Sequence, residues 1–336
     1  MGRVIKKIIR GTIAVLVILV LVVNVIPLFI GDGYAKGKGK LPEDSTTWMS
    51  KIDGKTKLNQ INIPGTHDSG TEYVQLPLFS RCQALSIEEQ LNQGYRYLDI
   101  RLGEDGEDLI LKHGFTKCRE EAFPWWSNYK LVDLLQTCYD FLSAHPSETI
   151  IFCVKYEDGN LSTKEFQEIL NRRLETDKDM WIRSGEIPTL DEARGKLVLL
   201  RRYEDEAGLA DKAGIPAIWE NQPGTEDVSK SYEVVNNKES IPLVVQDRYE
   251  YNTEDKWKAI VNTFDFMDSS KTDNTVFLNF ISTKGPHKAG MPNLYAKKLN
   301  DRLFAWSFDK GTRRGWVIVD YANPELAKRV YSSNIY

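Results

Sequence analysis

Short apolar runs alternate with helical patterns along almost the whole chain, and this alternation limits the folds that the sequence can adopt. Eight runs have strand character, at Gln60–Pro64, Tyr95–Arg101, Leu109–His113, Thr149–Lys155, Lys196–Arg202, Leu243–Gln246, Val276–Ile281 and Trp316–Asp320. Six segments have helical spacing, at Ser86–Asn92, Leu131–Ala144, Thr163–Thr176, Asp255–Phe266, Leu294–Phe304 and Pro324–Tyr331. This order predicts a single-domain α/β fold, an irregular (β/α)8 barrel of the TIM type. A doubly wound sheet is the alternative.

The predicted barrel also indicates where functional side chains gather, because such folds carry their active sites at the C-terminal ends of the strands. Polar and charged residues lie at or just after these ends, namely His67, Asp99, Arg101, His113, Lys155, Arg202, Asp247 and Asp320. We therefore expect these side chains to surround one site at the mouth of the barrel.

Two of the four histidines, His67 and His113, stand in turns directly after strand-like runs. Histidine is the side chain whose ordinary pKa lies near neutrality, so one imidazole can accept a proton while another donates one. Asp99 and Arg101 lie two residues apart, which places them on the same side of a strand. Imidazoles, orienting carboxylates and a guanidinium together favour acid–base chemistry at a phosphodiester.

The N-terminus has the pattern of an export segment. Four basic residues up to Arg10 precede Gly11–Ile30, which contains no charge and, at about 1.5 Å per residue, is long enough to span a bilayer core of about 30 Å. Residues 1–30 are therefore a signal anchor, or a signal peptide cleaved near Gly33–Ala35. In both cases the basic end stays cytoplasmic, residues 31–44 form a flexible linker, and residues 45–336 are exported as the barrel domain.

Charge and cysteine content exclude several classes of site. The net charge is -4 and no basic stripe is present, so nucleic acid is not an expected partner. The four cysteines lack the spacing of a zinc site. In an exported protein, Cys82 and Cys118 are candidates for a disulfide, whereas Cys138 and Cys153 suit buried free thiols.

Seven segments carry a resemblance to a known family, and they run in order through the whole exported part of the chain. They are Ile63–Thr71, Gln90–Arg101, Lys112–Gly114, Phe141–Ile151, Ala193–Tyr203, Val245–Tyr249 and Gly315–Tyr321. In these segments the chain resembles bacterial phosphatidylinositol-specific phospholipase C, of the phospholipase C X-domain family. Each motif alone is a moderate signal, whereas seven in register are a strong one.

The resemblance implies catalytic roles for residues at the predicted barrel mouth. His67 would be the general base that removes the proton of the inositol 2-hydroxyl, with Asp320 orienting it. His113 would be the general acid for the diacylglycerol oxygen, with Asp68 beside it. This division agrees with the chemistry, because the attacking alkoxide forms on one side of the phosphorus while a poor leaving group is protonated on the other.

Arg101 decides the expected cofactor. Related metal-dependent enzymes hold a calcium ion against the phosphate with carboxylates. Here the matching position carries a guanidinium, a fixed cation whose donors suit phosphate oxygens. Asp99 is then the partner of Arg101 or of the attacking hydroxyl, and we expect neither a metal nor another cofactor.

The resemblance also implies the substrate and the product. Arg202 and Asp247 would contact inositol hydroxyls, Tyr249 would stack on the ring, and Lys155 would line the pocket. No cluster for additional phosphates is evident, so phosphatidylinositol or glycosylphosphatidylinositol is expected, cleaved to diacylglycerol and inositol 1,2-cyclic phosphate. The alternatives are a metal-dependent glycerophosphodiester phosphodiesterase and a non-catalytic, membrane-tethered inositol-lipid-binding module.

Aromatic segments after the two histidine motifs suggest contact with the lipid surface. Trp125 and Trp126 follow the second motif, and Tyr73–Phe79 follows the first. Tryptophan and tyrosine favour the headgroup region of a bilayer. We expect a monomer that works at the extracellular face of the cell membrane, or that is secreted after cleavage.

Overall fold

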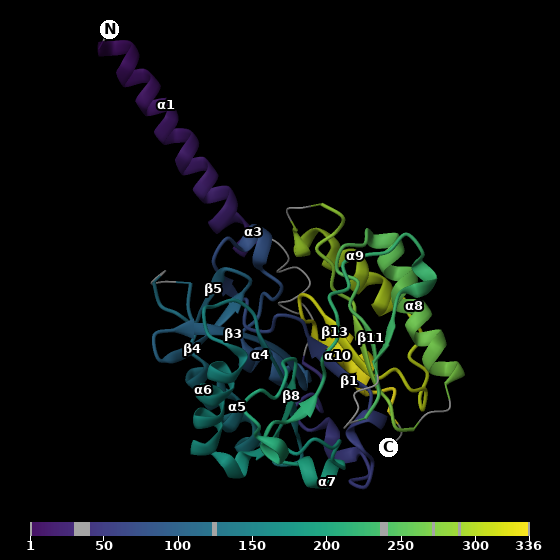
Figure 1. The fold of residues 1–336 in the computed structure, drawn as a ribbon. Coiled ribbons are helices and arrows are strands. Elements are labelled where there is room, and N and C mark those ends of the chain that lie inside the picture. The colour runs from purple at the N-terminus through teal and green to yellow at the C-terminus, as the bar shows by residue number, and fades with distance from the viewer. Residues whose placement is uncertain are drawn as a thin grey trace.

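The computed structural model describes residues 2–29, 41–122, 126–235, 241–270, 273–287 and 290–334, which form a curled sheet covered by helices (Figure 1). The strands are β1 (Ile63–Thr66), β2 (Tyr73–Val74), β3 (Tyr97–Asp105), β4 (Asp108–His113), β5 (Thr116–Arg119), β6 (Ile150–Tyr156), β7 (Trp181–Ile182), β8 (Leu197–Arg201), β9 (Ile215–Pro216), β10 (Glu233–Val235), β11 (Leu243–Gln246), β12 (Val276–Phe280) and β13 (Trp316–Val319). The helices are α1 (Gly2–Val20), α3 (Pro77–Ser80), α4 (Ile87–Asn92), α5 (Leu131–Ala144), α6 (Thr163–Thr176), α7 (Leu190–Ala193), α8 (Thr253–Ser269), α9 (Pro292–Ala305) and α10 (Pro324–Tyr331).

Parallel strands form the barrel wall in the order β11, β12, β13, β1, β3, β6, β8 and β9. The predicted irregular barrel is therefore confirmed. β10 adds an antiparallel strand beside β11. Among the described residues no ladder joins β9 to β10 or β11, so the sheet curls into a barrel that hydrogen bonds leave open at this seam.

One predicted strand lies outside the barrel wall. The run Leu109–His113 forms β4, which pairs antiparallel with the outer part of β3, with Leu111 opposite Leu102. β3 extends beyond the barrel, and β4 returns along it, so His113 comes back to the barrel mouth. Two short strands that the sequence pattern did not predict, the two-residue β7 and β9, instead pair parallel with β8 at this end of the sheet.

All six predicted helical segments are helices, and the one capping box that the sequence predicts, at the start of α4, is present. Ser86 accepts a hydrogen bond from the backbone N–H of Glu89, whose side chain accepts one from the N–H of Ser86, which confirms the predicted capping box of α4. Asn323 caps α10, where Pro324 occupies a first-turn position whose N–H would lack a partner in any case. These two caps fix where the chain enters α4 and α10.

Two buried apolar clusters hold the barrel together. One spans β1, β11, β12 and β13 and the helices beside them, and contains the packed rings of Tyr97 and Trp316, whose centroids are 5.8 Å apart. The other fills the space between β3, β6, β8 and helices α4 to α6. Cys118 packs in this second cluster with Val74 and Leu109, while Cys82 lies at the barrel mouth, so the candidate disulfide is not formed and all four cysteines are free.

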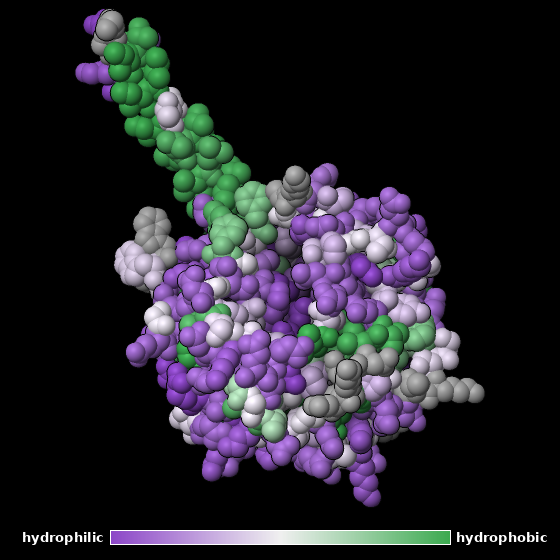
Figure 2. Space-filling model, in the orientation of Figure 1, coloured by the Kyte–Doolittle hydropathy of each residue, from purple (hydrophilic) through white to green (hydrophobic). Residues whose placement is uncertain are grey.

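The N-terminal helix projects from the barrel domain next to α3 (Figure 1). After α1 it continues as a π-helical turn, Leu21–Val25, and a 3-10 turn, Ile26–Leu28, and the stretch Arg3–Leu28 is long and apolar enough to cross a membrane. Figure 2 shows it as a hydrophobic rod that stands out from a largely hydrophilic domain. The predicted cleavage region Gly33–Ala35 and most of the predicted linker lie outside the described residues.

Candidate active site

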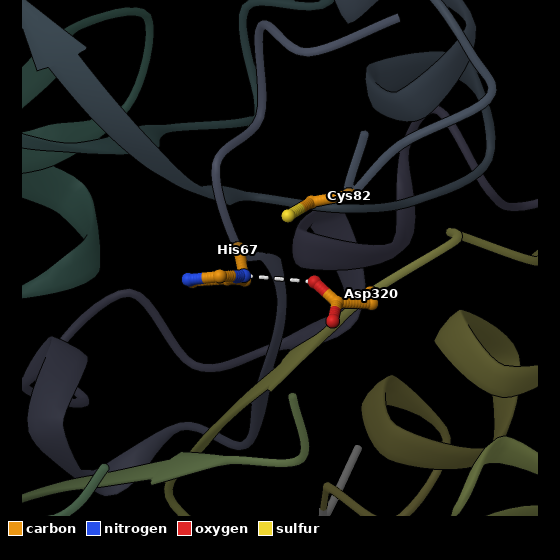
Figure 3. A group of neighbouring side chains, drawn as sticks. All are labelled: His67, Cys82 and Asp320. Carbon is orange, nitrogen blue, oxygen red and sulfur yellow. Dashed lines mark hydrogen bonds and ion pairs between the residues drawn. The ribbon is translucent and has the colours of Figure 1, made fainter. Parts of the chain in front are cut away.

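Strand register brings His67 and Asp320 together from opposite ends of the domain sequence. Thr66 at the end of β1 pairs with Val319 at the end of β13, and the backbone N–H of His67 donates to the carbonyl of Val319 at 3.0 Å. The next residue of each strand therefore points into the same space. His67 Nδ1 lies 2.8 Å from Asp320 Oδ1 (Figure 3).

The chain turns sharply right after both of these side chains. Asp68 has φ +44° and Tyr321 has φ +52°, left-handed conformations that cost energy for residues other than glycine. Gln83 secures the junction, because its side-chain amide donates to the carbonyls of His67 at 2.8 Å and of Val319 at 2.9 Å. The surrounding contacts thus fix the strained turns that aim the imidazole and its carboxylate.

Hydrogen-bond partners assign the tautomer of His67. Its Nε2 lies 2.8 Å from Nη2 of Arg101. A guanidinium only donates, so Nε2 is the acceptor and Nδ1 carries the proton that is donated to Asp320. Burial by itself lowers the pKa of His67, but the carboxylates of Asp320 and Asp68 outweigh it and hold that pKa above its usual value. His67 is a buried base with a carboxylate behind it.

Arg101 sits in a cage of three carboxylates. Its guanidinium contacts Asp68 at 3.1 Å, Asp99 at 3.2 Å and Glu157 at 3.2 Å. Burial by itself lowers the pKa of Arg101, but the nearby carboxylates raise it more and hold it well above its usual value. These carboxylates belong to Asp68, Asp99 and Glu157. Conversely, burial raises the pKa of Asp99, but Arg101 and Arg202 prevail and keep that pKa below its usual value. The cage holds a permanent cation beside the base.

His113 reaches the same space from the end of β4. Its Nδ1 lies 2.8 Å from the carbonyl oxygen of Ser80 and 3.5 Å from Asp68 Oδ2. The same Asp68 oxygen is 3.5 Å from His67 Nε2. One buried carboxylate oxygen therefore stands between both imidazoles, while the closest hydrogen-bond partner of His113 is a backbone carbonyl that sequence patterns do not reveal.

A cavity of about 340 Å³ opens in front of these groups. The side chains expected at the site that line it are His67, Arg101, His113, Lys155, Arg202, Asp247, Tyr249 and Asp320. Asp68 and Asp99 lie behind this wall, where they contact Arg101. The structure thus brings all ten predicted catalytic and substrate-binding residues into one place.

Several residues at the site escaped sequence reasoning. Glu157 contacts both Arg101 and, at 2.6 Å, Lys155; burial raises its pKa, but these two cations hold the pKa far below the usual range. Trp219 stacks under the guanidinium of Arg202 at 3.7 Å and donates to Asp247 at 3.2 Å. Trp219 follows no recognisable strand, and Glu157 stands one residue beyond β6, where only the barrel geometry would have indicated it.

Of the two tryptophans expected at the membrane, Trp126 has an exposed side chain, and Trp125 lies outside the described residues. Exposed aromatic rings also stand at Phe115, after the His113 turn, and at Phe79, which lines the cavity. Among the described residues, two overlapping sets of side chains are spaced for a metal ion: His67, Cys82 and Asp320 (Figure 3), and Asp68, Cys82 and His113.

Comparison with known proteins agrees with this geometry. The family model described as phosphatidylinositol-specific phospholipase C, X domain, matches residues 61–203. The 1-phosphatidylinositol phosphodiesterase of Staphylococcus aureus is 29% identical over 304 residues, covering 86% of this chain and 92% of the relative. The enzyme of the same name from Listeria monocytogenes is 28% identical, with 98% of each chain covered.

Solved structures give the same result for the fold. A phosphatidylinositol-specific phospholipase C from S. aureus aligns with a TM-score of 0.72 and 25% identity, covering 89% of this chain and all of that one. The enzyme from L. monocytogenes aligns with a TM-score of 0.68 and 26% identity, covering 87% of this chain and 99% of that one. Residues 61–203 thus match the X domain of phosphatidylinositol-specific phospholipase C, and the barrel as a whole is similar to the bacterial enzymes of that name.

Proposed function

We propose that this protein is a phosphatidylinositol diacylglycerol-lyase that needs no metal ion. The observation that carries the proposal is the placement of two imidazoles on either side of one buried Asp68 oxygen, in one cavity, with the caged guanidinium of Arg101 beside His67 and the carboxylate of Asp320 behind it. His67 Nε2 accepts the proton of the inositol 2-hydroxyl, and the resulting alkoxide attacks phosphorus. Asp320 holds the tautomer and stabilises the imidazolium that forms, as in other His–Asp pairs.

His113 completes the reaction by donating a proton to the departing diacylglycerol oxygen. Its Nδ1 is held by Ser80, so Nε2 is the nitrogen available to the cavity. Arg101 neutralises the charge that builds on the phosphate oxygens, a task for which a fixed cation in a water-poor site is well suited. Substrate phosphate would draw Nη2 of Arg101 away from His67 and free Nε2 at the moment when the base is needed.

The inositol ring fits the far wall of the cavity. Arg202 and Asp247 offer hydrogen-bond partners of opposite charge, Tyr249 offers a flat face, and Lys155 lies near the phosphate side next to Glu157. This set suits the hydroxyls of an inositol with a single phosphodiester, either in phosphatidylinositol or in its glycosylated form.

We also propose that the N-terminal segment is retained as an anchor and that the protein acts as a monomer. Buried Arg81 donates from Nη1 to the carbonyls of Pro27 at 3.0 Å and Leu28 at 2.9 Å, the unsatisfied end of the N-terminal helix. Arg81 follows α3 directly, and α3 supplies Phe79 to the cavity and the Ser80 carbonyl to His113. A retained helix would therefore place the cavity mouth, with Phe79, toward the outer leaflet.

The reaction is tested with the full chain, phosphatidylinositol vesicles and excess chelator, followed by the phosphorus signal of the products. A cyclic phosphodiester formed with chelator present is the expected result. Activity only after a divalent metal is added would favour the metal-dependent diesterase and reverse the argument from Arg101. Vesicle binding with no product under either condition would favour the non-catalytic lipid-binding module.

Retention of the anchor is tested separately in the producing cell by fractionation and by the mass of the mature protein. A full-length chain in the membrane fraction is expected. A soluble protein whose N-terminus lies near Gly33–Ala35 would show that the segment is a cleaved signal peptide.

A further inference from the structure

Three atoms that can bind a metal, from separate segments of the chain, meet at the proposed general acid. Asp68 Oδ2, Cys82 Sγ and His113 Nδ1 are separated by 4.0 Å (Asp68 to Cys82), 3.9 Å (Cys82 to His113) and 3.5 Å (His113 to Asp68). We propose that these atoms form an inhibitory binding site for Zn²⁺ or a similar thiophilic divalent cation. The cation has no part in the proposed reaction and stops it when bound.

The triangle of ligand atoms has the size that zinc requires. Its three edges place a point about 2.2 Å from all three atoms. Zinc binds thiolate sulfur at about 2.3 Å, imidazole nitrogen at about 2.0–2.1 Å and carboxylate oxygen at about 2.0–2.2 Å. The carbonyl oxygen of Ser80, 2.8 Å from His113 Nδ1 and 3.8 Å from Cys82 Sγ, stands beside the triangle as a further oxygen.

The charges around Cys82 favour a cation over a bare thiolate. Burial raises the pKa of this thiol far above its usual value, and the carboxylates of Asp320 and Asp68 raise it further. Without a metal the sulfur keeps its proton. A dication reverses this balance, because it displaces the thiol proton to solvent and meets the negative charge of the sulfur and of Asp68.

The second set of side chains, His67, Cys82 and Asp320, suits a cation less well, although the three lie close together (Figure 3). Nδ1 of His67 holds the proton that is donated to Asp320, and Nε2 faces the guanidinium of Arg101. If the proton moved to Nε2 of His67, this N–H would face the N–H of Arg101, and neither group could accept a hydrogen bond from the other. His113 has no such conflict, because its Nε2 faces the cavity and can hold the proton while Nδ1 binds the metal.

A bound cation would disable the acid. With the metal on Nδ1, the imidazole keeps a single proton on Nε2, loses its hydrogen bond to Ser80, and draws Asp68 away from Arg101. This inhibitory consequence rests on the proposed function, whereas binding of the metal does not.

The experiment uses the full-length protein in detergent micelles with its thiols reduced. Cd²⁺ is titrated first, because cadmium–thiolate bonds absorb in the ultraviolet and report binding without any turnover. Wild type and the matched control Cys138→Ala, whose buried thiol lies on α5, are expected to develop the band at one equivalent. Cys82→Ala is expected to lack it, and Cys82→Ser repeats the test with a side chain of nearly the same size.

Zinc inhibition of phosphatidylinositol cleavage is measured on the same proteins and reversed with chelator. Both Cys82 variants are expected to keep basal activity and to need at least about tenfold more Zn²⁺ for half inhibition, since loss of even an outer-shell group costs a metal site about 10–100-fold. A cadmium band that persists without Cys82, or no band in wild type, overturns the site. Binding without inhibition overturns the inhibitory role. Absent cleavage in every variant refutes the proposed function, while the cadmium titration still decides the site.

Discussion

Replacing Asp320 by asparagine tests the proposed base most directly. Asp320 Oδ1 lies 2.8 Å from His67 Nδ1, and the carboxylate side chain is only 2% exposed. Burial lowers the pKa of His67 and the carboxylate of Asp320 raises it, so Asp320→Asn should lower that pKa. The base must be neutral to act, and a lower pKa keeps it neutral to lower pH. The acidic limb of kcat/KM should therefore move to lower pH.

The substitution should also cost rate, because the introduced side-chain amide can donate to Nδ1 of His67 and drive the proton onto Nε2, the atom that must accept it. Loss of the correct tautomer in a His–Asp pair costs about 10⁴-fold in kcat, and we expect a fall of about 10³–10⁴-fold here. The assay is a pH series of initial rates on phosphatidylinositol micelles, with the exposed carboxylate change Asp301→Asn in α9 as control. A kcat within tenfold of wild type, or an acidic limb that stays in place, would refute the role of Asp320.

Three further predictions concern Arg101, the buried Lys256 and the contact of Arg81 with the end of the N-terminal helix. Arg101→Lys should lower kcat by about 10²–10³-fold with little change in vesicle binding, because one ammonium cannot replace a guanidinium that meets three carboxylates; unchanged kcat would show that Arg101 serves only structure. Burial lowers the pKa of Lys256 to about 7, so between that pH and about 10.5 the unfolded chain holds one more proton than the folded chain, and this group makes stability rise with pH by about 1.4 kcal/mol per unit. Denaturant titrations across this pH range should show this rise of the free energy of unfolding in wild type but not in Lys256→Met. An equal rise in both proteins would contradict the prediction, because it would mean that the Lys256 ammonium is solvated in the folded chain. Arg81→Ala should increase amide hydrogen exchange in Ile26–Leu28 and α3 of the full chain in nanodiscs; unchanged exchange would mean that the helix end is not held by this side chain.

The parts of the site that sequence reasoning located are those governed by strand periodicity. Asp99 and Arg101 share a face because side chains alternate along β3, and Asp247 and Asp320 follow strands whose apolar runs are plain. The apolar pattern of a strand does not indicate whether it pairs parallel or antiparallel with its neighbour. Leu109–His113 has the same apolar character as a wall strand, and only pairing with β3 shows that it runs antiparallel.

Composition and periodicity could not predict three other features, namely β9, the partner of His113 and the state of the cysteines. β9 is only two residues long and includes Pro216, and a proline, which has no N–H to donate, argues against a strand inside a sheet. The partner of His113 is a main-chain carbonyl, which any residue at position 80 would supply. The sequence suggests that Cys82 and Cys118 both lie in loops near the histidines, but Cys118 lies in β5, and its thiol packs in an apolar cluster while the thiol of Cys82 faces the site.

The docked end of the N-terminal helix changes the geometry in which enzyme and lipid meet. In a chain that keeps this helix, encounter takes place in two dimensions, by lateral diffusion within one leaflet. The rate then follows the surface fraction of phosphatidylinositol in that leaflet, and bulk lipid concentration has no effect. Released diacylglycerol stays in the same plane and dilutes the remaining substrate, while the inositol phosphate escapes into water. In such an anchored chain, the contacts of Arg81 with Pro27 and Leu28 would make turnover depend on the composition of the membrane that holds the enzyme.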